Sequence, residues 1–127
     1  MATRDAAERR EALATGARME ALVERSLLAA GWVVRARNWR GGGGELDVVA
    51  QRGLGSALEL RIVEVKARDL DDPLADEAVS SSKRTRLRRA ARLWMEQEGW
   101  EGPAAFLVAI VDPTDETVRW VDDAFDG

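Results

Sequence analysis

The sequence predicts a small α/β domain, in which one mixed sheet is flanked by helices in the order α-β-β-β-α-β-β. Two segments place apolar residues at helical spacing, and five shorter segments are rich in Val, Ile, Leu or Trp and bounded by turn residues. A chain of 127 residues suits one domain with its own hydrophobic core. We therefore assign residues 1–15 to a lead-in and residues 16–127 to a single domain.

The first helix is expected over residues 16–30. Thr15 is a suitable N-cap, and Gly31 stands where a left-handed residue ends a helix. The apolar stripe of this helix consists of Met19, Leu22, Val23, Leu27 and Ala30. The lead-in is rich in Ala, Glu and Arg, which favour an exposed helical or frayed segment.

Three strands are expected next, over residues 32–37, 45–51 and 57–67. The four consecutive glycines within residues 38–44 predict a loop between the first two, and residues 52–56 predict a turn before the third. Side chains alternate along a strand, so one face of the third strand should carry Leu58, Leu60, Ile62, Glu64 and Lys66.

The second half of the chain begins with an acidic loop at residues 69–73. A helix should follow over about 75–98, with Gly99 as its stop signal. The apolar run at 106–112 is typical of a buried strand. Residues 117–121 predict a final amphipathic strand.

Composition restricts the chemistry. The chain has no cysteine and no histidine, which excludes disulfides, thiolate or imidazole zinc sites and histidine catalysis. Any metal here would be held by oxygen ligands, which favour Mg²⁺ or Mn²⁺. The chain has neither an apolar run long enough to span a membrane nor an apolar leader, so we expect a cytoplasmic protein with no membrane partner.

Charge is unevenly distributed. The net charge of −4 argues against a general nucleic-acid binder, yet residues 83–92 carry six basic residues and no acid. Arg84, Arg88 and Arg92 are spaced by four and share one helix face. That face suits phosphate contacts, and a merely solvated basic face remains the alternative.

Asp47 and the Glu64-Val65-Lys66 segment carry the chemical signal. Glu64 and Lys66 share one strand face, and a short turn between the second and third strands would bring Asp47 beside Glu64. Two close carboxylates repel each other unless a cation or a proton lies between them. The pattern favours a divalent-metal site, with an ordinary surface ion pair between Glu64 and Lys66 as the alternative.

Several short motifs in register resemble the bacterial YraN-like family of the PD-(D/E)xK nuclease superfamily. They are the segments ARNWR (36–40), GELD (ending at Asp47) and VEVKAR (63–68), with Gly16, Glu20, Leu27 and Gly31-Trp32 before them and Lys83 and Ala90-Ala91 after them. The resemblance implies a restriction-endonuclease-like core, with Asp47 and Glu64 as metal ligands and Lys66 as the catalytic lysine. It also implies that Glu20 projects from the first helix toward them.

The chain departs from that family near Phe106. Ala105 and Leu107 stand where the family has Arg and Asp, which removes one charge of each sign close to the expected site. Asp47, Glu64 and Lys66 are all present, so we do not infer an inactive site, and the sequence leaves the effect of Ala105 and Leu107 on activity undetermined.

We therefore expect a metal-dependent phosphodiesterase that acts on DNA rather than RNA, with branched or single-stranded structures as candidate substrates. Further nucleic-acid contacts are expected from Arg37, Trp39, Arg40 and Lys83, and Trp39 lies between two arginines as a candidate for base stacking. Two alternatives remain open: a non-catalytic nucleic-acid-binding module, and a protein–protein adaptor that uses the acidic segment 69–77. The sequence leaves substrate structure and oligomeric state undetermined.

Overall fold

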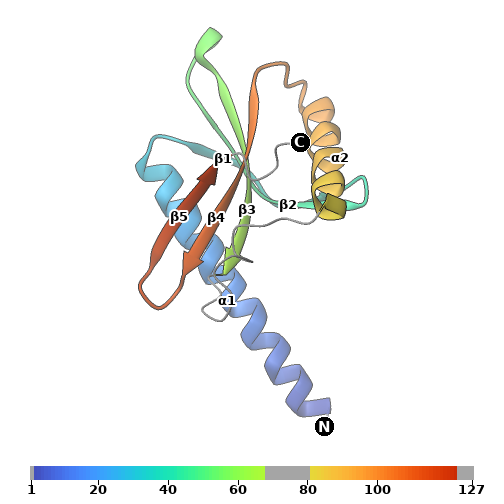
Figure 1. Ribbon diagram of the computed structural model, residues 1–127, viewed down its shortest axis with the longest axis vertical. Helices are drawn as coiled ribbons and strands as arrows, with labels where there is room; N and C mark the ends of the chain where they lie inside the picture. Colours follow the sequence, from blue (N-terminus) through green and yellow to red (C-terminus); the bar gives the residue numbers. More distant parts are fainter. Residues whose placement is uncertain (1, 68–80, 123–127) are drawn as a thin grey trace.

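A computed structural model describes residues 2–67 and 81–122 of the chain (Figure 1). One five-stranded sheet has the spatial order β1-β2-β3-β4-β5, and the β3–β4 pair is parallel while the other pairs are antiparallel. The predicted mixed sheet flanked by helices is confirmed. The elements are α1 (Ala2–Ala29), β1 (Val33–Gly41), β2 (Gly44–Arg52), the 3₁₀ turn η1 (Gly55–Ala57), β3 (Glu59–Ala67), α2 (Ser81–Glu98), β4 (Ala104–Asp112) and β5 (Thr117–Asp122).

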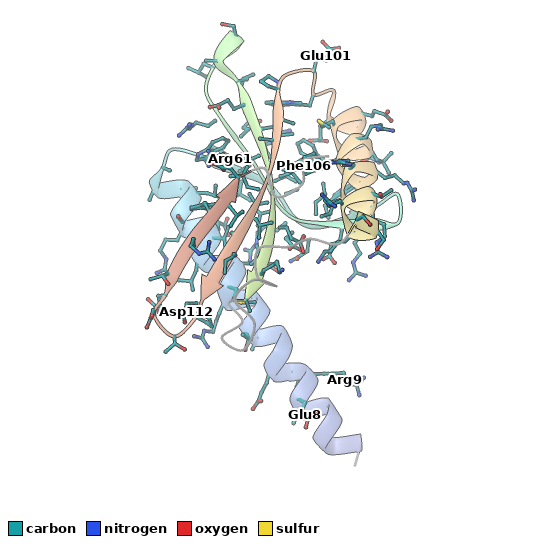
Figure 2. All side chains as sticks on the ribbon, viewed as in Figure 1. Glu8, Arg9, Arg61, Glu101, Phe106 and Asp112 are labelled. Carbon is teal, nitrogen blue, oxygen red and sulfur yellow. The ribbon has the colours of Figure 1, made fainter. Side chains whose placement is uncertain are left out.

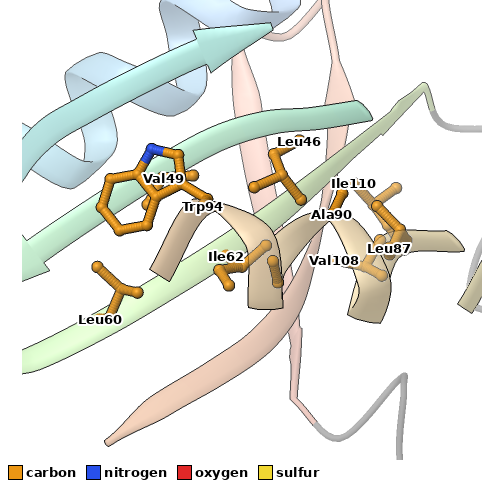
Figure 3. Close-up of a cluster of buried hydrophobic side chains, with 10 residues drawn as sticks. Leu46, Val49, Leu60, Ile62, Leu87, Ala90, Trp94, Val108 and Ile110 are labelled. Atoms are coloured by element: carbon orange, nitrogen blue, oxygen red, sulfur yellow. The ribbon is translucent and has the colours of Figure 1, made fainter. Parts of the chain in front are cut away.

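The two helices cover opposite faces of the sheet, as Figure 1 shows. The predicted alternation along β3 explains this arrangement, because Leu60 and Ile62 pack under α2 while Val63 packs under α1. Figure 3 shows the cluster beneath α2, which contains Leu46, Val49, Leu60, Ile62, Leu87, Ala90, Ala91, Trp94, Val108 and Ile110. Beneath α1 lie Leu22, Val23, Leu27, Trp32, Val48, Ala50, Val63, Ala109 and Val111.

Helix α1 is longer than predicted. It runs without a break through Thr15, so the expected N-cap at Thr15 and the helix start at residue 16 are wrong. The Ala, Glu and Arg residues before Thr15 are strong helix formers and continue the helix beyond the sheet, where Figure 2 places Glu8 and Arg9. Neither helix of the described part combines the length and apolarity that a membrane crossing demands.

The C-terminal end of α1 follows the prediction. Gly31 has φ +89°, and its N–H donates to the Leu28 carbonyl while the Trp32 N–H donates to the Leu27 carbonyl. This double hydrogen bond is the Schellman motif, which requires a left-handed residue. It directs the chain from the helix into β1 and buries Trp32 in the core.

The predicted loop at 38–44 is wrong. Strand β1 continues to Gly41 and β2 begins at Gly44, so Gly42 and Gly43 alone form the turn, with φ +60° and +82°. Positive φ at both central residues is the requirement of a type I′ two-residue hairpin turn, which glycine meets without strain. The glycines therefore form a tight hairpin rather than a flexible loop.

The same hairpin lies directly against α2. A Cβ atom added at Gly44 would stand 2.5 Å from the Arg86 backbone carbonyl oxygen, and one at Gly42 would stand 3.1 Å from the Arg89 side chain. Glycine therefore allows the hairpin to approach the helix backbone closely.

Replacing Gly44 by Ala should destabilise the protein by about 1–3 kcal/mol, because the added methyl group forces the hairpin and α2 apart. Urea unfolding measures the loss. The matched control is Gly16→Ala in α1, where an added Cβ meets nothing within 4 Å and helix propensity should give a gain of about 0.5–1 kcal/mol. Equal stability of Gly44→Ala and the parent would contradict this close packing.

The remaining elements match their predictions where the structure describes them. Helix α2 is described from Ser81 and ends at Glu98, and the following Gly99 has φ +66°. The expected acidic loop at 69–73 and the helix start near 75 lie outside the described residues. Strands β4 and β5 are present, and the Asp112 carboxylate accepts the Thr114 N–H in the turn that joins them.

Candidate metal centre

Asp47 and Glu64 come together from neighbouring strands. The antiparallel register pairs Val48 with Val63, so Asp47 lies immediately before and Glu64 immediately after the paired residues. The Asp47 carboxylate also accepts a hydrogen bond of 2.9 Å from the Val65 backbone N–H. The expected proximity of Asp47 to Glu64 is therefore confirmed.

The surroundings make a charged Asp47 unfavourable. Burial and the nearby Glu64 carboxylate raise the pKa of Asp47 to about 7 from an ordinary value of 3.8. A hydrogen bond to Glu64 and the charge of Glu45 act in the same direction, whereas the Val65 N–H lowers the pKa. The pair thus holds more negative charge than its surroundings favour.

Glu64 is the buried member of the pair. Its relative exposure is 5%. Among the residues that the structure describes, the other buried side chains are hydrophobic. Burying a carboxylate without a counter-charge costs several kcal/mol or more. Lys83 supplies that counter-charge, because its Nζ lies 2.5 Å from Glu64 Oε1.

The carboxylates line a pocket of about 440 Å³ between the β1–β2 hairpin and α2. Its walls carry charges of both signs, with basic side chains facing the acidic ones. The lining residues are Arg40, Gly41, Gly43, Gly44, Glu45, Asp47, Glu64, Lys83, Arg86 and Leu87. A pocket of this size admits a group such as a phosphodiester.

The basic face of α2 that lines this pocket differs from the one that sequence spacing suggested. Lys83 and Arg86 lie at the pocket, whereas Arg84, Arg88 and Arg92 do not line it. Arg84 and Arg88 are half-buried, and Arg92 is exposed. The i, i+3 relation of Lys83 and Arg86 would have marked the correct face, had the hairpin's position against α2 been known.

Glu20 approaches the carboxylates from α1. A second pocket, of about 640 Å³, is lined by Gly16, Ala17, Glu20, Asn38, Arg40, Glu45 and Asp47. Glu20 accepts a hydrogen bond of 2.9 Å from Asn38 Nδ2 and lies 3.6 Å from Arg37. The Arg37 guanidinium also lies 3.0 Å from Glu24, so Arg37 is held against α1.

Asn38 is a residue that sequence reasoning missed. It lies in β1 with φ +51°, a left-handed conformation that Asn tolerates better than most residues. This backbone conformation accompanies the side-chain amide's contact with Glu20. Its signal in the sequence was weak, because Asn in a segment ending in glycine also fits an ordinary loop.

Two other candidates lie outside the carboxylate pocket. Lys66 follows Glu64 on the α2 face of β3 and is half-buried, yet it is not among the pocket's lining residues. Trp39 packs against the α2 cluster, and an added Cβ at Gly41 would stand less than 3 Å from its ring. Trp39 therefore has a packing role, with part of its ring exposed.

Ala105 and Leu107 line a different pocket from the carboxylates, although Leu107 pairs with Val63, the residue before Glu64. They line a pocket of about 260 Å³ together with Trp32, Arg61 and Asp122. Figure 2 shows Arg61 and Phe106 on the part of the sheet far from Asp112. Neither residue is among those that line the pocket containing Asp47 and Glu64.

The donor chemistry at Asp47 and Glu64 fits a hard divalent cation. Within residues 2–67 and 81–122, no three acidic side chains gather closely enough to hold a metal ion. Mg²⁺ is commonly held by one or two carboxylates, with water and substrate phosphate completing its shell. Asp47 and Glu64 would supply those two carboxylates.

Comparison with known proteins identifies the family to which the chain belongs. Its residues 19–113 match the model of the uncharacterised protein family UPF0102. A UPF0102 protein of Nocardia farcinica is 45% identical over 91 residues, covering 69% of this chain and 68% of the relative. One from Streptomyces griseus is 38% identical over 95 residues, with coverages of 72% and 75%. One from Oleidesulfovibrio alaskensis is 40% identical over 81 residues, covering 63% of this chain but 39% of that longer relative. The chain is therefore a member of the UPF0102 family.

Proposed function

We propose that the protein is a divalent-metal-dependent phosphodiesterase that cleaves DNA, and that its sheet is a restriction-endonuclease-like core. The observation that carries the proposal is the meeting of Asp47 and Glu64 beside a pocket with basic walls. This arrangement supplies oxygen ligands for Mg²⁺ or Mn²⁺ and cationic groups for a phosphate in the same place. The resemblance of the flanking motifs to the PD-(D/E)xK superfamily supports the same assignment.

Each side chain has a task in this mechanism. Asp47 and Glu64 would hold the ion, and Arg40 and Arg86 would attract the phosphodiester and keep it against the hairpin. When bound, Mg²⁺ would polarise a phosphoryl oxygen and acidify a water molecule. Lys66 would orient the attacking water or stabilise the charge that develops on the phosphate.

The basic wall explains how a chain with net charge −4 can act on DNA. Cationic groups concentrated at one pocket attract phosphate locally, while the negative remainder disfavours binding elsewhere on the surface. A small site of this kind suits a flexible or locally distorted strand better than tight, extended contact with a regular duplex. Branched and single-stranded DNA are therefore the substrates to test first.

Incubation with linear, single-stranded and branched DNA, and with matched RNA, tests the proposal in Mg²⁺, Mn²⁺ or EDTA. Cleavage should require the divalent ion and should fall on the order of 10²-fold or more in Asp47→Ala and in Glu64→Gln. Cleavage that persists when Asp47→Ala and Glu64→Gln are combined in one protein would overturn the assignment. DNA binding with a strong salt dependence but without cleavage would favour the non-catalytic module instead.

A further inference from the structure

Lysine is rare in this chain, and both lysines lie near Glu64. Of the 19 Lys and Arg residues, only Lys66 and Lys83 are lysines. Lys66 follows Glu64 by two positions on the same strand face, and Lys83 contacts the Glu64 carboxylate. Of the two lysines, Lys83 is the one that lines the pocket and contacts the Glu64 carboxylate.

The two kinds of cation differ in how firmly they hold a carboxylate. A guanidinium presents a planar fork that binds both carboxylate oxygens, whereas an ammonium is a compact point charge on a flexible stem. Lys83 contacts one oxygen of Glu64, Oε1, at 2.5 Å. A single-point contact of this kind can be exchanged for another cation more readily than a forked one.

Burial is unequal across the pair. The Glu64 side chain is 5% exposed, whereas the Lys83 side chain is 46% exposed on the first turn of α2. A charged Glu64 is therefore stabilised by a cation at its carboxylate, whereas the Lys83 ammonium keeps access to water. The lysine is the more exposed partner of this ion pair.

We infer that Lys83 is an exchangeable counter-ion of Glu64, which holds the carboxylate in the metal-free protein and leaves it when a divalent cation binds there. This inference rests on the proposed metal centre. The ammonium and the cation would compete for the same carboxylate, and their like charges repel each other. Once displaced, the Lys83 ammonium would remain at the pocket beside Arg86, where it could form an ion pair with a substrate phosphate.

Removing the lysine charge should therefore strengthen metal binding. Titration of Mn²⁺ by calorimetry into Lys83→Met should show an affinity about 5- to 10-fold tighter than in the parent protein, since the competing ion pair is gone. Arg25→Met is the control, because it removes one positive charge from an exposed position on α1 and leaves the Glu64–Lys83 contact in place. Its affinity should change by less than about twofold, a difference expected of screened charges.

Stability supplies a second readout. Without metal, Lys83→Met should melt below the parent, because Glu64 loses its counter-charge, and added Mn²⁺ should raise its melting temperature more than it raises the parent's. Lys83→Arg keeps the charge and guards against a folding defect in Lys83→Met. Its affinity for Mn²⁺ should equal the parent's or be weaker, since the guanidinium holds Glu64 more firmly.

The two proposals fail in different ways. Equal or weaker Mn²⁺ binding by Lys83→Met, with clear binding by the parent, would overturn the exchange and leave the metal centre intact. Absence of binding in the parent and in every Lys83 variant would overturn both. Tighter binding by Lys83→Met alone among the variants would support the exchange.

Discussion

Replacing Lys66 by Met is expected to reduce divalent-dependent DNA cleavage on the order of 10²-fold or more, with metal binding retained. Lys66 lies two residues beyond Glu64 on the same face of β3, and in the proposed mechanism its long side chain contacts a phosphate bound at the carboxylates. Methionine keeps much of the stem's length and apolar bulk and removes the charge that chemistry would use. A merely structural ion pair at this half-buried position would contribute about 0–1 kcal/mol to stability.

The measurement compares cleavage rate, Mn²⁺ affinity and melting temperature in the same preparations. Arg25→Met is a suitable control, since it removes one positive charge from an exposed position on α1 and should keep the parental rate. Lys66→Arg separates charge from proton transfer, because guanidinium keeps the charge but does not release a proton near neutral pH. Cleavage by Lys66→Met at the parental rate would remove Lys66 from the mechanism.

The elements that the sequence specified best are those set by local rules. Alternation along 57–67 placed Ile62 and Glu64 on one face and Val63 on the other, as the two core clusters show. Gly31 and Gly99 marked the helix ends, because a left-handed residue there needs no tertiary partner to be recognised. Such signals reside within a few consecutive residues.

The errors in the fold arose where local signals were ambiguous. Four glycines fit a flexible loop as well as a tight hairpin, and only the pairing of Gly41 with Gly44 distinguishes the two. Thr15 is a good N-cap, yet a good cap does not interrupt a helix whose preceding residues also favour helix. Both errors concern where an element ends rather than which element it is.

In the candidate site too, the features set by local sequence were predicted, and those set by tertiary packing were not. The proximity of Asp47 to Glu64 followed from the short connection between β2 and β3, since adjacent antiparallel strands bring such positions together. The contact between Lys83 and Glu64 joins a helix to a strand through tertiary packing, which no residue spacing encodes. The same packing decided that Arg86, rather than Arg88, lies at the pocket.

Replacing Asp47 by Asn should stabilise the metal-free protein at pH 8 and have little effect near pH 4. The pKa of Asp47 is raised to about 7 in the folded protein, from an ordinary value of 3.8 that applies to the unfolded chain. At pH values between these two pKa values, the folded chain therefore binds more protons than the unfolded chain. The contribution of Asp47 to the free energy of unfolding is therefore fully present below about pH 4 and lost as pH rises through 7. Asparagine stays neutral, and its amide can still donate toward Glu64 and accept the Val65 N–H.

The expected gain for Asp47→Asn at pH 8 is on the order of 2–3 kcal/mol. This is less than the full rise in the Asp47 pKa implies, because Asp47 interacts with the neighbouring charged groups and does not act alone. Urea unfolding of both proteins in EDTA, from pH 4 to pH 8, measures the difference in unfolding free energy. Groups that titrate in the same way in both proteins contribute equally, so their contributions cancel from this difference. The difference should grow through the interval in which Asp47 loses its proton. A difference that stays constant with pH would show that folding does not raise the pKa of Asp47. A gain at pH 8 that disappears when Mn²⁺ is added would in turn show that the cation stabilises the acidic pair of the parent protein, since mass action favours the state that binds it.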